Sequence, residues 1–253
     1  MENIRKEDID ISQIYGNDCI LSTEEFIKEN KFSESGLSNK LAEESLRIYG
    51  VNQIKQSKPK RWYNYFFASL FTPFNLILLG ITFILLYTDV ILPASPSPIN
   101  IIVIVILILV STILEFVENF RSNKAAERLK QLVETTATVI RNGEEINIPI
   151  KQITVGDLVK LSAGDMIPAD LRIIDSKDLY VSQSSITGES DAVKKVSETE
   201  LKSIDDIESI TDIDNICFMG TNVISGTAKG IVTKIGDSTY FGKVAHTLVS
   251  RKT

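Results

Sequence analysis

The run Leu179-Tyr-Val-Ser-Gln-Ser-Ser-Ile-Thr-Gly-Glu-Ser190 carries more information about the fold than any other stretch of the 253-residue chain. Its beginning, Leu179 to Ser182, has the composition of a strand, and the polar tetrapeptide Thr187-Gly188-Glu189-Ser190 follows it. A tetrapeptide recurs by chance, and an exposed turn explains it equally well. Its meaning therefore depends on the segments around it.

Short strands and turns surround this run. Asn142-Gly143 suits a tight primed turn, so a hairpin is predicted from Thr136–Arg141 and Glu144–Ile150. The segment Asn222 to Lys234 is interpreted as a second strand pair with Ser225-Gly226 near its turn. Further short strands are expected at 158–161, 171–174, 179–182 and 216–218. Many short strands at this spacing predict a small antiparallel β-sandwich or distorted jelly roll.

The composition excludes several classes of function. The formal net charge is −6 and the sequence pI is near 5.0, which argues against nucleic acid as the main partner. One His and two Cys cannot make a usual zinc site, so no metal-binding residue is proposed. The two thiols are far apart in sequence and are interpreted as reduced, in a cytoplasmic setting. The acidic stretch at residues 198–214 is interpreted as a solvated loop with one helical turn.

Two stretches, Trp62 to Thr88 and Val90 to Leu114, contain no charged side chain. A membrane-spanning helix needs roughly 20 mostly apolar residues, so each stretch can supply one. The segment Pro93–Pro98 between them is interpreted as a short turn. Two buried helices of a soluble protein are the alternative, but long paired apolar stretches favour the membrane.

Basic residues flank the two predicted spans, whereas the turn between them has no Lys or Arg. By the positive-inside rule, both ends of the hairpin and both chain termini lie in the cytoplasm. Glu115 and Glu118, near the inner end of the second span, fit an ion pathway or, more simply, the solvated interface. The helix is expected to continue over Glu115 to Val133 because this stretch has no Gly or Pro. The basic residues are Lys55, Lys58, Lys60 and Arg61 before the first span, and Arg121, Lys124, Arg128 and Lys130 after the second.

The amino-terminal region is polar. Residues 1 to about 35 are interpreted as a partly ordered tail with short helices. Ser38 then fits a helix N-cap and Gly50 a helix stop. Near the other end, Thr239 to Thr253 has the composition of a starting helix.

Several separate motifs together resemble the P-type ATPases, ion pumps that phosphorylate one of their own aspartates. Gly164-Asp-Met-Ile-Pro-Ala-Asp170 matches a family segment, Gly156-Asp157 the turn before it, and Thr187–Ser190 the actuator loop. The resemblance runs from about Gly36 to the end of the chain. For Gly164, Asp165, Pro168 and Asp170, a rigid structural turn is a sufficient explanation.

The finer resemblance is to the magnesium-importing branch of this family. Calcium and proton pumps share the actuator motif but fit the remaining stretches less well. The matching stretches are Pro73-Phe-Asn-Leu-Ile-Leu78, Arg121 to Ala126, Ala163 to Arg172, Cys217-Phe-Met-Gly-Thr221 and Tyr240-Phe-Gly242.

The resemblance implies a mechanism. An acyl phosphate forms on an aspartate of the pump and is later hydrolysed, and a carboxylate on the actuator loop positions the attacking water as a general base. The resemblance assigns the role of general base to Glu189. It also implies that Gly188, which has no side chain, lets the loop backbone approach the phosphate. Thr187 and Ser190 offer hydroxyls to the loop or to the phosphate. ATP and magnesium are implied as cofactors of the full-length pump, and none is expected on this chain alone.

The resemblance also implies partners, a location and four segments. The partners are the lipid bilayer, the phosphorylation and nucleotide-binding domains of the pump, and a transported cation, with magnesium the first choice. The location is the plasma membrane, as a multi-pass protein. The segments are an amino-terminal tail and helices at 1–61, the transmembrane hairpin at 62–119, the actuator domain at 120–243, and at 244–253 the start of a linker to a third transmembrane helix.

One departure and one absence qualify the resemblance. After Ser190 the chain reads Asp191-Ala-Val-Lys-Lys195, without the proline that the family usually has there, which makes docking of the loop less certain. The chain contains no Asp-Lys-Thr-Gly-Thr segment to carry the phosphate, so it is expected to be inactive alone. The alternatives are a calcium or other cation pump, a non-enzymatic two-span regulatory partner of an intact pump, and an unrelated membrane-anchored β domain.

Overall fold

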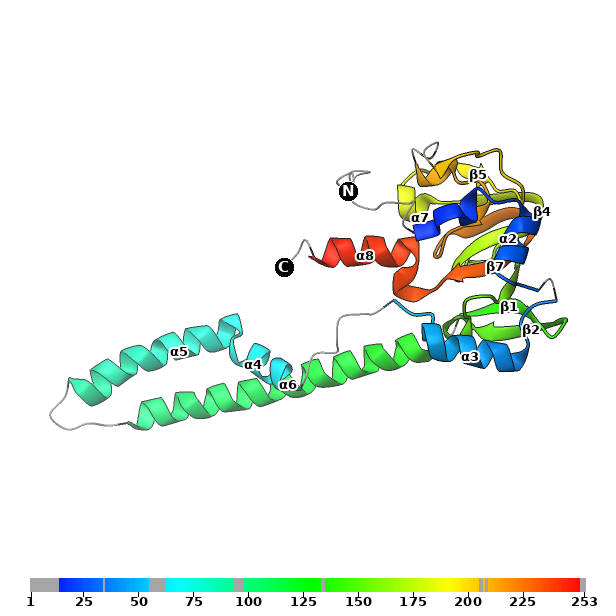
Figure 1. Cartoon of the computed structure of the whole chain (residues 1–253). Coiled ribbons are helices and arrows are strands. Elements are labelled where there is room, and N and C mark those ends of the chain that lie inside the picture. The colour runs from blue at the N-terminus through cyan, green and yellow to red at the C-terminus, as the bar shows by residue number, and fades with distance from the viewer. Residues whose placement is uncertain are drawn as a thin grey trace. The chain divides into compact units, whose positions relative to one another are not determined.

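The computed structural model describes residues 14–33, 35–54, 62–92, 98–132, 135–204, 207 and 209–250. The chain divides into two compact units, one formed by Met1–Lys55 with Glu134–Thr253 and the other by Gln56–Val133 (Figure 1). We call them the β unit and the membrane unit. The predicted borders of the four segments stay predictions. The basic flank at residues 55–61 and most of the predicted Pro93–Pro98 turn lie outside the described residues.

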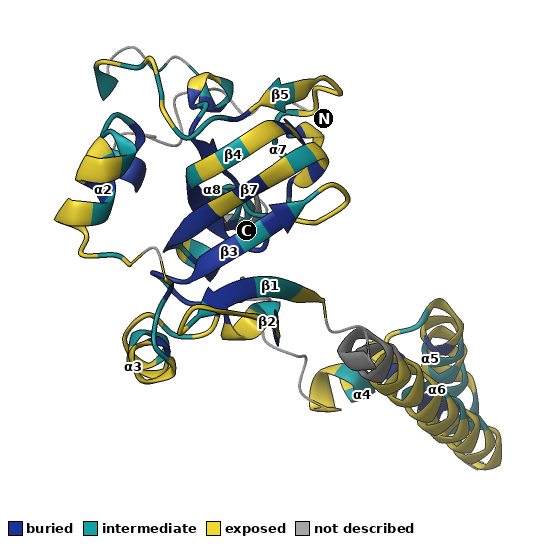
Figure 2. Cartoon of the chain, turned by 90° about the vertical axis from the view of Figure 1, so that its right-hand side faces the viewer, coloured by how far each residue is buried: buried dark blue, intermediate teal, exposed yellow. Residues whose placement is uncertain are grey.

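The membrane unit consists of α4 (Trp62–Leu70), α5 (Pro73–Leu85), a π-helical turn (Leu86–Ile91) and α6 (Ile99–Leu132). Two stretches, Pro73–Ile91 and Ile99–Ala125, are long and apolar enough to cross a membrane. Both helices expose most of their surface (Figure 2), as expected of helices that face lipid. The predicted continuation of the second helix past Glu115 is confirmed, whereas the first apolar stretch is broken before Pro73.

The β unit contains one open, seven-stranded antiparallel sheet with the strand order β2-β1-β3-β7-β4-β5, and β6 also pairs with β4. The predicted combination of two membrane helices with an antiparallel β domain is therefore confirmed, with the strands joined in a single sheet. The strands are β1 (Thr136–Arg141), β2 (Glu144–Pro149), β3 (Leu158–Ser162), β4 (Asp170–Ser182), β5 (Ala192–Lys194), β6 (Ile216–Cys217) and β7 (Asn222–Lys234).

The β1–β2 hairpin forms as predicted. Asn142 and Gly143 have φ angles of 52° and 80°, and Arg141 pairs with Glu144 across them. Two consecutive positive φ angles are the mark of a type I′ turn, which matches the twist of the flanking strands.

The predicted second strand pair is wrong, because residues 222–234 form the single strand β7. Gly226 has a φ of 82° and faces Asp178, at a register shift between β4 and β7. It therefore lies in a β-bulge. A glycine with positive φ is typical of both a bulge and a tight turn, so the two have the same sequence pattern. The strands predicted at 171–174 and 179–182 are likewise parts of one long strand, β4.

The amino-terminal region belongs to the core of the β unit. It forms a 3-10 turn (Gly16–Cys19), α2 (Thr23–Glu29) and α3 (Asn39–Tyr49). Phe26 of α2 is fully buried against Ile140, Leu158 and Ile231 of the sheet. Ser38 caps α3 and Gly50 ends it, as predicted. The sequence interpretation of residues 14–33 as part of a tail missed this packing.

The acidic stretch at 198–214 is also more than a solvated loop. Ile210 and Ile213, around a 3-10 turn at Ile210–Asp212, are buried in a cluster with Tyr15, Cys19 and Phe218. Apolar side chains lie between the charged residues of this stretch and reach the cluster. The high content of acidic residues led to the prediction of a solvated loop.

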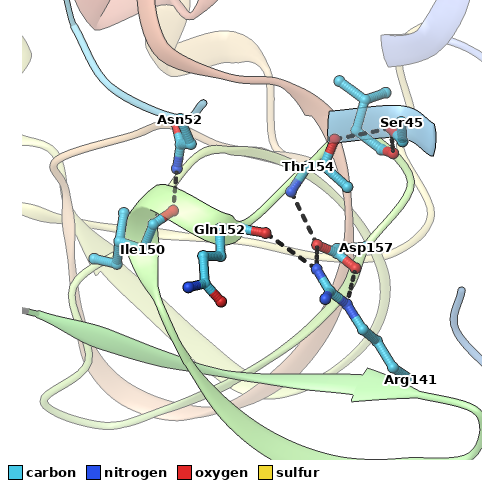
Figure 3. Close-up of polar contacts among 8 residues, drawn as sticks. Ser45, Asn52, Arg141, Ile150, Gln152, Thr154 and Asp157 are labelled. Atoms are coloured by element: carbon cyan, nitrogen blue, oxygen red, sulfur yellow. Dashed lines mark hydrogen bonds and ion pairs between the residues drawn. The ribbon is translucent and has the colours of Figure 1, made fainter. Parts of the chain in front are cut away.

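Helix α3 is fastened to the rest of the β unit by polar contacts (Figure 3). Ser45 donates to the carbonyl oxygen of Val155 at 2.8 Å, and Asn52, just after the helix, donates from Nδ2 to that of Ile150 at 3.1 Å. Beside them Arg141 forms a bidentate ion pair with the buried Asp157, with its Nη2 2.6 Å from Oδ2. The Gly156-Asp157 turn thus has a structural role.

Candidate active-site loop

The tetrapeptide Thr187–Ser190 lies in the connection between β4 and β5. After β4 the chain makes a single helical turn, α7 (Ser184–Thr187), which ends at Gly188 with a left-handed φ of 78°. Gly188 donates its N–H to the carbonyl oxygen of Ser184 at 3.0 Å. The glycine thus reverses the chain directly before Glu189.

The Thr187 hydroxyl organises the start of the loop. It donates to the carbonyl oxygen of Gln183 at 3.2 Å and accepts from the backbone N–H of Glu189 at 3.1 Å. Ser185 ties the same turn to the sheet by donating to the carbonyl oxygen of Gly220 at 2.8 Å. These bonds fix the backbone of Glu189 and leave its side chain to act elsewhere.

Gly188, Glu189 and Ser190 are exposed, so the four predicted site residues lie together on one accessible loop. Within the part of the chain that the structure describes, the carboxylate of Glu189 accepts no hydrogen bond and has no ion-pair partner. An exposed, uncommitted carboxylate on a short fixed loop can enter a partner's site and take a proton there.

The exit of the loop is held firmly, despite the missing proline. Ser182 pairs with Ala192, and Val181 with Val193, so the two ends of the loop lie side by side. Lys195 follows: its N–H donates to the carbonyl oxygen of Leu179 at 2.9 Å and its buried Nζ to that of Ile213. The ammonium group also lies 5.1 Å from the centroid of the Phe218 ring.

The electrostatics of Lys195 follow from its burial. Removal from water disfavours the charged form and lowers the pKa of Lys195 to about 8. Electrostatic interactions with Cys217 and Asp214 act in the opposite direction and raise the pKa in part. The lysine connects the loop exit with the acidic stretch, which was not predicted from the sequence.

Asp170, the last residue of the Gly164–Asp170 motif, joins three segments. Its carboxylate accepts from the Tyr15 hydroxyl at 2.7 Å, the Met219 N–H at 2.8 Å and the Tyr240 N–H at 2.8 Å. Burial raises the pKa of Asp170 to about 6, against these three hydrogen bonds. Tyr240 begins α8 (Tyr240–Ser250), so Asp170 also binds the start of that helix. These contacts agree with the structural interpretation of the motif.

Arg172 is the largest fully buried side chain of the β unit, and sequence reasoning missed its role. It donates to the carbonyl oxygens of Asp18, Leu21 and Ser197 at 3.0, 2.8 and 2.7 Å, and also to that of Ile173. Burial lowers the pKa of the guanidinium from its ordinary value. Arg172 thereby ties the amino-terminal segment to the chain that leaves the loop.

Gln183, at the junction of β4 and α7, is 2% exposed. Neither its side-chain nitrogen nor its oxygen has a hydrogen-bond partner among the described residues. A buried amide that lacks hydrogen-bond partners carries a desolvation cost.

The acidic side chains were also considered as ligands of a metal or a transported ion. Among the described residues no group of three or more His, Cys, Asp or Glu side chains is placed to hold a metal ion. In the membrane unit, Glu115 and Glu118 line a hollow of about 690 Å³ together with Thr72 and Ser111. Both alternatives for these two carboxylates, an ion pathway and a solvated interface, fit that position.

Comparison with known proteins gives the family. Residues 131–249 match the family model of the P-type ATPase actuator domain, and residues 18–85 match that of the cation transporter/ATPase N-terminus. The chain carries the N-terminal and actuator domains of a P-type ATPase. The loop at 187–190, its fixed exit and the Asp170 contacts to Met219 and Tyr240 all lie within the actuator match.

Several curated relatives are cation-transporting P-type ATPases. The magnesium-transporting ATPase, P-type 1, of Salmonella typhimurium strain LT2 is 43% identical over 204 residues, which cover 78% of this chain and 21% of the relative. The Escherichia coli K12 protein of the same name is 37% identical over 233 residues, which cover 90% of this chain and 25% of the relative. Calcium-transporting ATPase 1 of Lactococcus lactis is 33% identical over 227 residues, also covering 90% and 25%.

The chain thus spans about a quarter of the length of these relatives. Its actuator region is similar to that of magnesium-transporting ATPases, and its two apolar helices are consistent with a membrane location.

Proposed function

We propose that the chain is the amino-terminal part of a magnesium-importing P-type ATPase, whose actuator loop promotes hydrolysis of the aspartyl phosphate and couples it to ion transport. The exposed, uncommitted carboxylate of Glu189, on a loop held at both ends, is the observation that carries this proposal. The 37–43% identity to two magnesium-transporting ATPases supports the choice of ion.

In the proposed step, water hydrolyses the aspartyl phosphate. Glu189 accepts a proton from a water molecule while the water oxygen attacks phosphorus. The bond between phosphorus and the aspartyl oxygen breaks, which releases inorganic phosphate and returns the aspartate as a carboxylate. Gly188 allows the loop backbone to approach the phosphoryl group. Thr187 holds the Glu189 backbone, and Ser190 offers a hydroxyl to the phosphate oxygens.

The cofactors and partners of this step lie outside the chain. ATP supplies the phosphoryl group and magnesium neutralises its charge in the full-length pump. The phosphorylation and nucleotide-binding domains, the bilayer and the transported cation are the partners, and this chain alone is inactive. We further propose a multi-pass protein of the plasma membrane with both termini in the cytoplasm, because basic residues flank both spans.

The 33% identity to a calcium-transporting ATPase favours one second candidate, a calcium pump with the same chemistry. The ion that stimulates phosphoenzyme turnover distinguishes the two. At a constant magnesium concentration that saturates the phosphoryl site, calcium transport predicts that added calcium stimulates turnover, and magnesium transport predicts that it does not.

The test places residues 18–250 in the matching segment of the Escherichia coli magnesium-transporting ATPase and follows decay of the ³²P-phosphoenzyme. Glu189→Gln removes the base without changing the size of the side chain, so decay is expected to slow by roughly 10²–10⁴-fold. The matched control is Glu144→Gln, an exposed glutamate on β2, which leaves decay unchanged. Equal decay in the Glu189→Gln chimera and the unsubstituted chimera would sink the assignment.

A further inference from the structure

The interior of the membrane unit is polar, although its surface is apolar. Of the side chains described there, four are buried, namely Ser69, Asn75, Ile108 and Thr112. Three of these four carry a hydroxyl or an amide. Such groups are costly inside a bilayer unless they bond to one another, so their gathering at one place needs a reason.

The break in the first span supplies that reason. Pro73 has no N–H, so the carbonyl oxygen four residues earlier, on Ser69, loses its helical donor. The Asn75 side chain replaces it by donating from Nδ2 to that oxygen at 3.0 Å. Thr72 caps the new helix by accepting from the Asn75 N–H. The break between α4 and α5 is therefore a satisfied, built feature.

The second hydrogen of the same amide reaches the other span. Asn75 Nδ2 lies 3.2 Å from Oγ1 of Thr112, in the middle of α6. One side chain thus joins the end of α4, the start of α5 and the neighbouring helix. The aromatic rings of Phe66 and Phe116 also meet edge to face, with centroids 6.1 Å apart, and pack α4 against α6.

We propose that the hydrogen bonds of the Asn75 amide fix the break in the first span to the second span, so that both spans move as one rigid body. Lipid offers no competing hydrogen bonds, so the amide keeps both donors engaged. This proposal rests on the two helices lying in a bilayer and is independent of the role of Glu189.

The test is a double-mutant cycle on the 253-residue chain in lipid bicelles, read as the unfolding equilibrium constant of the membrane helices. Thr112→Val is expected to weaken the helix pair by about 3- to 30-fold when Asn75 is present. It should have no effect in the background of Asn75→Leu. Oδ1 of Asn75 is buried without a hydrogen-bond partner among the described residues. Asn75→Leu therefore removes this unfavourable buried atom as well as the two hydrogen bonds of the amide. For this reason the coupling energy between Asn75→Leu and Thr112→Val is measured, and not the effect of Asn75→Leu alone.

The matched control is Thr82→Val. The Thr82 hydroxyl donates to the carbonyl oxygen of Leu78 in its own helix at 2.8 Å, so its effect should be the same with and without Asn75. Additive effects of Asn75→Leu and Thr112→Val would overturn the proposal.

A second measurement covers the case in which Asn75→Leu fails to insert. The two side-chain NH₂ proton resonances of Asn75 are followed by NMR in the otherwise unchanged chain. Thr112→Val should shift one of these resonances upfield, whereas Thr82→Val should shift neither. Unmoved Asn75 resonances in Thr112→Val would show that the spans are not joined through this side chain.

Discussion

Lys195 is a buried cation placed where the candidate active-site loop returns to the sheet. Its pKa is lowered to about 8, against 10.5 in an unfolded chain. Between these two pH values the unfolded chain binds more protons than the folded one, so this residue makes the free energy of unfolding rise with pH. The rise should amount to roughly 1–3 kcal/mol and should be lost in Lys195→Met.

The measurement is chemical unfolding of the full chain, followed by circular dichroism at pH 7.5 and pH 10. Lys194→Met is the matched control, because Lys194 is exposed and adjacent. Tyr15, which titrates at alkaline pH, is present in all three proteins and cancels in the comparison. Burial raises the pKa of Cys217 and the Lys195 charge lowers it in part, so any change in its titration belongs to the effect of Lys195→Met. The same pH slope in Lys195→Met and the unsubstituted chain would contradict the prediction.

The residues of the loop could be predicted from the sequence, and those that hold it could not. Thr187 to Ser190 are adjacent in sequence and form a recognisable motif. Arg172 and Lys195, in contrast, act on carbonyl oxygens of residues up to 154 positions away, Asp18 being the farthest. Backbone carbonyls carry no sequence signal, so such contacts appear only when the fold is known.

At the scale of an element, the bulge between β4 and β7 decides how the long strands run. A Cβ atom on Gly226 would lie 2.2 Å from the carbonyl oxygen of Asp178, which no backbone of this geometry can accommodate. Gly226→Ala should therefore lower the free energy of unfolding by roughly 3–5 kcal/mol. Thermal and urea unfolding of the full chain measure the loss.

Gly143→Ala is the matched control for this prediction. Gly143 has nearly the same φ angle, 80° against 82°, but no atom lies within 4 Å of a Cβ placed there. Alanine at residue 143 therefore suffers only the backbone strain, of about 1–3 kcal/mol. Equal losses in the two variants would mean that the bulge yields and that the close approach of Asp178 is not a constraint.

The same bulge explains why the elements were predicted only in part. The β1–β2 hairpin was predicted correctly, because Asn142-Gly143 joins two strands that pair locally. Ser225-Gly226 has the same local composition but lies opposite Asp178, 48 residues earlier in the chain, in a continuous strand. A glycine with positive φ serves both purposes, and only the partner strand distinguishes them.

At the scale of the whole β unit, the amino-terminal segment 14–33 completes the domain that carries the loop. Its polar sequence gives weak periodicity, so its place in the core could not be predicted. Its contacts are nevertheless specific: Tyr15 donates to Asp170, Phe26 fills a fully buried position, and two of its carbonyl oxygens accept from Arg172. Part of the order around the loop therefore comes from residues far from it in sequence.

A chain that begins at residue 35 tests this dependence. It removes two of the carbonyl acceptors of the buried Arg172 guanidinium, those of Asp18 and Leu21, and it uncovers the site of Phe26. Breaking the partners of a buried charge costs about 3–5 kcal/mol, so the melting temperature should fall by roughly 10 °C or more. Arg172→Met provides the decisive comparison. In the shortened chain it removes a stranded charge and should recover part of the loss, whereas in the full chain it removes satisfied hydrogen bonds and should destabilise. If Arg172→Met changed the melting temperature in the same direction in both chains, the amino-terminal segment would not be what stabilises the buried guanidinium.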